Sequence, residues 1–120
     1  MGLKLDKNRP VGPQICEMLC VGIVTGTYAP QQRLPSVREL AVALGVNPNT
    51  VQRSLETLEE QGLLYSVRGS GWYVQEDTSL AQAELARMRR QKTEDYIRTM
   101  QQLGVTLAEI KNYVKEWENE

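Results

Sequence analysis

The chain has 120 residues and a formal net charge of −1, and its length indicates one domain or one small domain with an appendage. It contains no histidine, which excludes the commonest general base, the commonest zinc ligand and any nucleophile that histidine would activate. Its longest apolar run, "MLCVGIV", is too short to cross a membrane, and the N-terminus lacks the order of a signal peptide. We therefore expect a cytosolic protein that does not enter a membrane.

The first predicted helix runs from about Gly12 to Thr25. Four side chains follow the spacing of one buried face: Ile15, Leu19, Gly22 and Ile23. Cys16 and Cys20 stand four residues apart, so they face the same way. We interpret them as small buried residues in a reducing cytosol, with a thiol sensor, or half of a metal site shared by two chains, as the alternative. One chain has too few cysteine and histidine ligands for a zinc site, and we expect no metal and no cofactor.

Two short helices are predicted next, separated by a sharp turn. Ser36 caps the first and forms a capping box with Glu39, and Gly45 supplies a left-handed stop. Asn47 caps the second, with Pro48 at its first helical position, and Gly62 closes it. This spacing is typical of a helix-turn-helix, whose second helix presents its first turn to the major groove of DNA.

The first turn of that second helix displays polar side chains that bond bases and phosphates. Gln52 or Asn49 can pair with adenine, and Arg53 can reach guanine or a phosphate. Asn-Pro-Asn-Thr is also an efficient helix start in its own right. Arg38 and Arg68, which flank this turn in the predicted fold, favour the DNA-binding interpretation.

Beyond Gly62, "LLYSV" and "WYV" flank the glycine-containing "RGSG" and predict a β-hairpin. The hairpin completes the order of a winged helix-turn-helix over residues 10–75. Its cationic tip, with Arg68 and Gly69, can lie against a DNA backbone or in the minor groove.

Two amphipathic helices, about Leu80–Leu103 and Leu107–Trp117, are predicted after the polar linker "QEDTS", and a capping box joins Thr106 to Glu109. They form the second region, residues 80–120. Two such helices cannot bury both apolar faces alone, so they pack on each other or on a second copy. We assign dimerisation to their apolar residues: Leu85, Met88, Tyr96, Met100, Leu103, Leu107, Ile110, Val114 and Trp117.

Residues 13–75 resemble the DNA-binding domain of the GntR family of bacterial transcriptional regulators. The resemblance rests on "LPSVRELAVALGVNPNTVQRSLETLEEQGLL" and "RGSGWYV", which extend over about half of the chain. The two-helix tail resembles the YtrA-type branch, where such a tail serves dimerisation. The resemblance implies a homodimer that binds a palindromic operator and usually represses, frequently at operons for membrane transporters.

Together, the residues and the resemblance assign DNA contact to ten positions: Ser36, Arg38, Asn47, Pro48, Asn49, Thr50, Gln52, Arg53, Arg68 and Gly69. Two departures from the family pattern stand out. Gln32 occupies a loop position where glycine is typical, and Gln52 occupies a position where some members carry a base-reading arginine. Operator preferences of those members therefore do not transfer.

The fold class expected overall is mainly α with a small β-hairpin wing and a two-helix dimerisation tail. The alternative function is a winged-helix module that binds protein instead of DNA, which would expose apolar residues around the turn. An enzyme is not expected, since histidine, a phosphate-binding loop and a metal cluster are all missing from the sequence. Two interpretations of the aromatic residues of the tail are left open. Tyr96, Tyr113 and Trp117 either line a pocket for a small-molecule effector or belong to the core.

Overall fold

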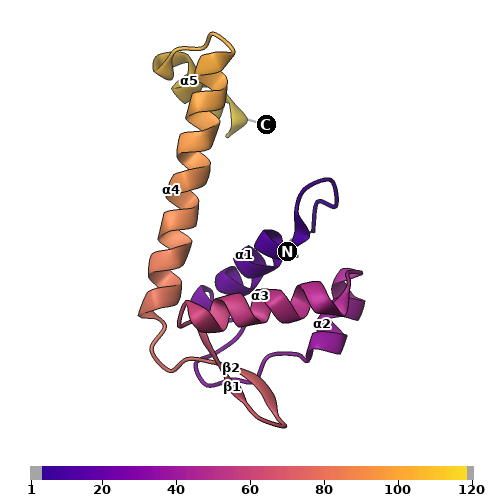
Figure 1. Cartoon of the computed structure of the whole chain (residues 1–120). Coiled ribbons are helices and arrows are strands. Elements are labelled where there is room, and N and C mark those ends of the chain that lie inside the picture. Colours follow the sequence, from indigo (N-terminus) through magenta and orange to yellow (C-terminus); the bar gives the residue numbers. More distant parts are fainter. Residues whose placement is uncertain (1–3, 119–120) are drawn as a thin grey trace. The chain divides into compact units, whose positions relative to one another are not determined.

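The structure, a computed structural model, describes residues 4–118 (Figure 1). The elements in chain order are α1 (Val11–Val24), α2 (Val37–Leu44), α3 (Pro48–Glu60), β1 (Leu64–Val67), β2 (Gly71–Val74), α4 (Ser79–Gln102) and α5 (Leu107–Trp117). This order confirms the predicted fold class, and each predicted helix boundary lies within about two residues of the observed one.

The chain divides into two compact units, and the division falls within α4. The N-terminal unit extends to Leu85 and the C-terminal unit begins at Ala86. This division lies later in the chain than the polar linker before α4, where the sequence predicts it. The first turns of α4 therefore belong to the winged-helix unit.

The predicted helix caps of the helix-turn-helix are confirmed. Ser36 Oγ accepts a hydrogen bond from the Glu39 amide, and Glu39 Oε1 accepts one from the Ser36 amide, each 3.1 Å long. Asn47 Oδ1 accepts from the Asn49 amide at 2.8 Å. Between the helices, Gly45 has φ 66° and ψ 40°, the left-handed conformation that ends α2.

Replacing Gly45 by alanine is expected to lower the free energy of unfolding by about 1–2 kcal/mol, because an L-residue with a Cβ is strained at this φ. Chemical denaturation of the full chain measures the change. Gly45→Asn is the matched variant, since asparagine tolerates the left-handed region, and it should lose less. Equal losses in both variants would show that the conformation of this turn is not what limits stability.

The core of the N-terminal unit lies where α1 and α2 pack on α3. Its fully buried side chains come from all parts of the unit: Ile15, Leu19, Cys20, Val51, Leu55, Leu58, Leu64 and Val74. Burying an aliphatic side chain of this size contributes roughly 1.5–3 kcal/mol. Since the inner side of α3 is held in this way, the polar residues on its other side face outward.

The hairpin is antiparallel, with Leu64 opposite Val74 and Ser66 opposite Trp72. The segment before α2, predicted as a plain loop, pairs with the outer edge of β2. The Gln31 amide donates to the Val74 carbonyl at 2.8 Å, and the Leu34 amide donates to the Trp72 carbonyl at 2.9 Å. The residue with positive φ in this segment is Gln31, at 65°, one position before the Gln32 that the sequence analysis singled out.

The start of α4 is part of the N-terminal core. Ala81 and Leu85 are 1% and 4% exposed, and Cys20 Sγ donates to the Ala81 carbonyl at 3.3 Å. Leu80 packs against Gly62, where an added Cβ would lie 2.7 Å from Leu80 Cδ1. These contacts seat the first two turns of α4 on the winged-helix unit.

The two cysteines of α1 face the protein. Cys20 is buried, and the half-buried Cys16 directs its thiol to the Ser54 carbonyl at 3.6 Å. Burial raises the pKa of the Cys16 thiol, the opposite of what a reactive thiolate needs. Within residues 4–118 there is no cluster of three or more cysteine, aspartate or glutamate side chains arranged to hold a metal ion.

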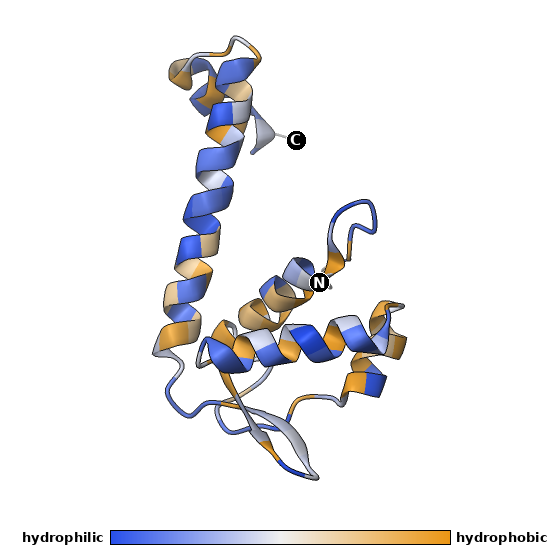
Figure 2. Cartoon of the chain, viewed as in Figure 1, coloured by the Kyte–Doolittle hydropathy of each residue, from blue (hydrophilic) through white to orange (hydrophobic). Residues whose placement is uncertain are grey.

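The C-terminal unit holds the rest of α4 and α5. The predicted capping box of α5 is confirmed, with Thr106 Oγ1 accepting from the Glu109 amide at 3.3 Å. Most of the length of α4 is hydrophilic, as its colouring in Figure 2 shows. Among the described residues from Ala86 onward, Ile110 alone is buried. In the described part of the chain, no helix combines the length and the apolar character that a membrane span requires.

Candidate nucleic-acid interface

The first turn of α3 presents the polar residues that the sequence predicts there. Asn49 and Arg53 are exposed, and Thr50 and Gln52 are half-buried. Asn47 and Pro48 are exposed as well, but the carboxamide oxygen of Asn47 is already occupied as the helix cap. The first role of Asn47 is therefore to start the helix.

Four exposed arginines of the N-terminal unit lack an ionic partner: Arg33, Arg38, Arg53 and Arg68. Within residues 4–118, none of their guanidinium groups makes a hydrogen bond or lies within 4.0 Å of a carboxylate. Other arginines do have partners, since Arg9 pairs with Asp6 and Arg90 pairs with Glu94, each at 3.0 Å. Unpaired guanidinium groups around a polar helix turn suit phosphate oxygens, which supply the missing negative charge.

Arg33 was not singled out in the sequence analysis. Its Nε lies 3.3 Å from the position that a Cβ on Gly71 would take, so it lies against the start of β2, next to the turn of the wing. Hydrogen bonds from Ser36 hold the pKa of Glu39 below its usual value, and the nearby charge of Arg33 lowers it further. Arg33 therefore lies between the wing and the start of α2. No local pattern shows this, because it depends on pairing of residues 31–34 with β2.

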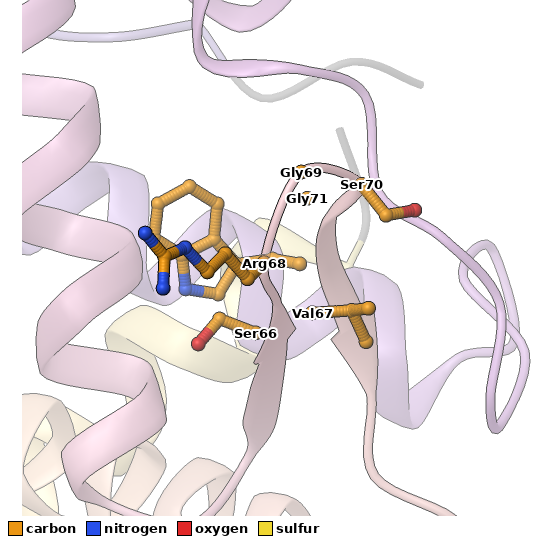
Figure 3. A pocket seen from close by; sticks show the side chains of 7 residues that line it. Ser66, Val67, Arg68, Gly69, Ser70 and Gly71 are labelled. Atoms are coloured by element: carbon orange, nitrogen blue, oxygen red, sulfur yellow. The ribbon is translucent and has the colours of Figure 1, made fainter.

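The wing carries its cation beside an open groove of about 620 Å³, lined by residues 66–72 (Figure 3). The turn closes with the Ser70 amide donating to the Val67 carbonyl at 2.9 Å, and the Ser70 and Tyr73 hydroxyls share a hydrogen bond. Gly69 has φ 80°, and no atom lies within 4 Å of the place where a Cβ would be. The tip is therefore open for close approach by a ligand backbone.

Two of the residues predicted for dimerisation are buried within the single chain. Leu85 belongs to the core of the N-terminal unit, and Ile110 is 3% exposed in the C-terminal unit. The other seven are at least partly exposed: Met88, Tyr96, Met100, Leu103, Leu107, Val114 and Trp117. Tyr96, Met100, Val114 and Trp117, together with Tyr113, line an apolar groove of about 420 Å³. This groove is one apolar surface of the C-terminal unit.

Comparisons with known proteins agree with this geometry. Residues 13–74 match the family described as bacterial regulatory proteins, gntR family. Over 111 residues the chain is 32% identical to the HTH-type transcriptional repressor YtrA of Bacillus subtilis, covering 91% of this chain and 85% of that protein.

Solved structures show the same relationship. A GntR family transcriptional regulator from Listeria monocytogenes has a TM-score of 0.80 and 40% identity, covering 93% of this chain and 98% of that one. AraR(DBD), solved in complex with operator ORX1, has a TM-score of 0.54 and 33% identity over 62% of this chain and 90% of that one. Since the family model spans more than half of the sequence and YtrA aligns with nearly all of it, the chain belongs to the GntR family of bacterial transcriptional regulators, in its YtrA-type branch.

Proposed function

We propose that this protein binds operator DNA sequence-specifically in the cytoplasm and represses transcription, with α3 in the major groove and the wing on the flanking backbone. The observation that carries this proposal is the polar first turn of α3 together with exposed arginines that form no salt bridge with any described residue, before α2, on α2, on α3 and in the wing. Arg33, Arg38 and Arg68 supply phosphate contacts, while Asn49, Thr50 and Gln52 supply base contacts. AraR(DBD), whose fold matches 62% of this chain, was solved in complex with an operator, which supports the proposal.

The repressing species is a homodimer that binds a palindromic operator. Trp117 and Leu103 are 75% and 73% exposed, although such large apolar side chains are normally covered. Packing the apolar groove of one C-terminal unit against that of a second copy removes the Trp117 side chain, which lines the groove, from water. Two-fold symmetry then presents one recognition helix to each half-site.

Repression works by occlusion, since a bound dimer blocks access of the transcription machinery to the promoter. YtrA is a repressor, and the YtrA-type resemblance supports a transporter operon as the target. A small-molecule effector, if the protein uses one, would bind the aromatic groove of Tyr96, Tyr113 and Trp117 and compete with the dimer contact.

The test is binding of the full-length protein to DNA from upstream of its own gene, with scrambled competitor, at several salt concentrations. We expect selective binding with a steep fall in affinity as salt rises, because each neutralised phosphate releases counterions. Absence of binding to any duplex at low salt would overturn the proposal. It would favour a winged-helix module that binds protein.

Gln52→Ala is expected to lower the preference for operator over scrambled DNA by about ten- to hundredfold, because a bidentate contact to adenine discriminates by roughly 1–3 kcal/mol. Affinity for scrambled DNA should change little, since the charge of the protein is unaltered. Competition binding measures both affinities. Gln61→Ala, an exposed glutamine just after α3, is the matched control. Unchanged selectivity in the Gln52 variant would remove this residue from the base contacts.

A further inference from the structure

The last turn of α3 is tied to the wing by one carboxylate. Glu59 Oε2 accepts a hydrogen bond from the Ser66 hydroxyl at 2.7 Å and another from the Ser66 amide at 2.9 Å. Both donors belong to β1, and the acceptor belongs to the recognition helix. No functional role is predicted for Glu59 from the sequence alone, and the neighbouring Glu60 makes no comparable contact among the described residues.

Both hydrogen bonds stabilise the ionised form of the Glu59 carboxylate. The Ser66 hydroxyl and amide hold the pKa of Glu59 below its ordinary value, and the indole of Trp72 adds a smaller effect in the same direction. Hydrogen bonds to an ionised acceptor are shorter and stronger than neutral ones. Trp72 stands directly opposite Ser66 in the hairpin, and its buried Nε1 has no hydrogen-bond partner of good geometry within residues 4–118.

The hydrogen bonds between Glu59 and Ser66 lie close to the tip of the wing in the sequence. Side chains alternate along a strand, so Ser66 and Arg68 point to the same side while Val67 points to the other, as Figure 3 shows. Arg68 lies two residues from the anchored position, which is roughly 7 Å of extended chain. Holding both donors of Ser66 therefore constrains the backbone from which the Arg68 side chain extends.

We propose that Glu59 is a positioning residue for DNA binding: it sets the angle of the wing against α3 so that Arg68 meets the backbone while the first turn of α3 meets bases. The inference rests on the proposed function, because Glu59 acts through a DNA contact of Arg68. Glu59 itself carries a negative charge and lies at the end of α3 away from the first turn, so it does not contact phosphate.

The effect of the Glu59–Ser66 hydrogen bonds on the wing is tested first without DNA. Amide resonances of the wing are compared by ¹H–¹⁵N NMR in the full-length protein, in Glu59→Ala and in the control Glu60→Ala. Both variants change resonances around the substituted residue, but we expect shifts or broadening at residues 66–71 in the Glu59 variant and none there in the Glu60 variant. Unchanged wing resonances in Glu59→Ala would overturn the inference, whatever the DNA result.

The role in binding is tested by a double-mutant cycle on the operator. Arg68→Ala is expected to weaken binding about tenfold and to reduce the salt slope by about one, and Glu59→Ala to weaken it about three- to tenfold with a similar change in slope. The double variant should match Arg68→Ala within about twofold, because Glu59 acts through that arginine. Combination with Arg38→Ala should instead multiply the two losses.

The outcomes separate the two proposals. The positioning role would be overturned if the affinity losses of Glu59→Ala and Arg68→Ala multiplied in the double variant, or if Glu59→Ala left the salt slope unaltered. Operator binding by the unmodified protein would still stand. An Arg68→Ala variant with unchanged operator affinity would also overturn the positioning role and leave the proposed function standing. Should Glu59→Ala fail to fold, Glu59→Gln keeps the size of the side chain and removes its charge, and Ser66→Ala removes only the hydroxyl bond. Failure of the unmodified protein to bind DNA would contradict the proposed function instead.

Discussion

Replacing Arg38 by alanine is expected to lower operator affinity by about 10- to 150-fold while the fold and the proposed dimer persist. Arg38 lies in the first turn of α2, is exposed, and has no ionic partner within the described residues. Its guanidinium therefore gives up no protein contact when it binds DNA. A hydrogen bond from a charged donor contributes about 1.5–3 kcal/mol, which corresponds to that range of affinities.

Binding of the Arg38 variant is measured by fluorescence anisotropy on the operator, with sedimentation and thermal unfolding to check dimer and fold. Arg90→Ala is the matched control, because Arg90 is an exposed arginine that already pairs with Glu94 on α4. We expect the control to bind within about twofold of the unmodified protein. An Arg38 variant that bound equally well would place the DNA contacts elsewhere than on α2.

Truncation within α4 is expected to separate folding from dimerisation. A chain ending at Ala86 keeps the buried Ala81 and Leu85 and should fold as a monomer. Without the C-terminal unit it loses the second half-site contact, which lowers apparent operator affinity by about 10²–10⁴-fold. A chain ending at Asp77 also loses the buried leucine, and deleting such a side chain costs about 2–5 kcal/mol of stability.

Both truncated chains are compared by chemical denaturation, sedimentation and operator titration. The chain ending at Ala86 is expected to be more stable than the chain ending at Asp77, because Cys20 donates to the Ala81 carbonyl and Leu80 packs on Gly62. Equal stability of the two chains would show that the first turns of α4 contribute nothing to the core. A dimeric chain ending at Ala86 would move the dimer interface into the winged-helix unit.

Features that depend on a few neighbouring residues could be predicted from the sequence. The capping boxes of α2 and α5, the left-handed Gly45 and the proline start of α3 are such features, and the structure confirms each of them. Their determinants lie within a few residues of one another, so a short window contains the whole of the physical cause. The position of the polar residues on α3 follows from the same helical period.

What could not be predicted depends on contacts between distant segments. Arg33 reaches the wing because residues 31–34 pair with β2, about forty residues later in the chain. Leu85 matches the apolar stripe of α4 as well as any other residue, and only the fold shows that it is buried in the N-terminal unit. Glu59 is one of two adjacent glutamates, and β1 determines which of them accepts hydrogen bonds from the wing.

The carboxylates that hold the local structure have a consequence for how the regulator responds to acid. Backbone and side-chain hydrogen bonds lower the pKa of Glu39, Glu59 and Asp77, so their contribution to stability is fully present at neutral pH and disappears only as pH falls through those lowered values. The chain has no histidine to change charge between pH 6 and 8. Moderate acidification from pH 8 to pH 6 is therefore expected to leave in place the local structure that these three carboxylates stabilise, which thermal unfolding at the two pH values measures.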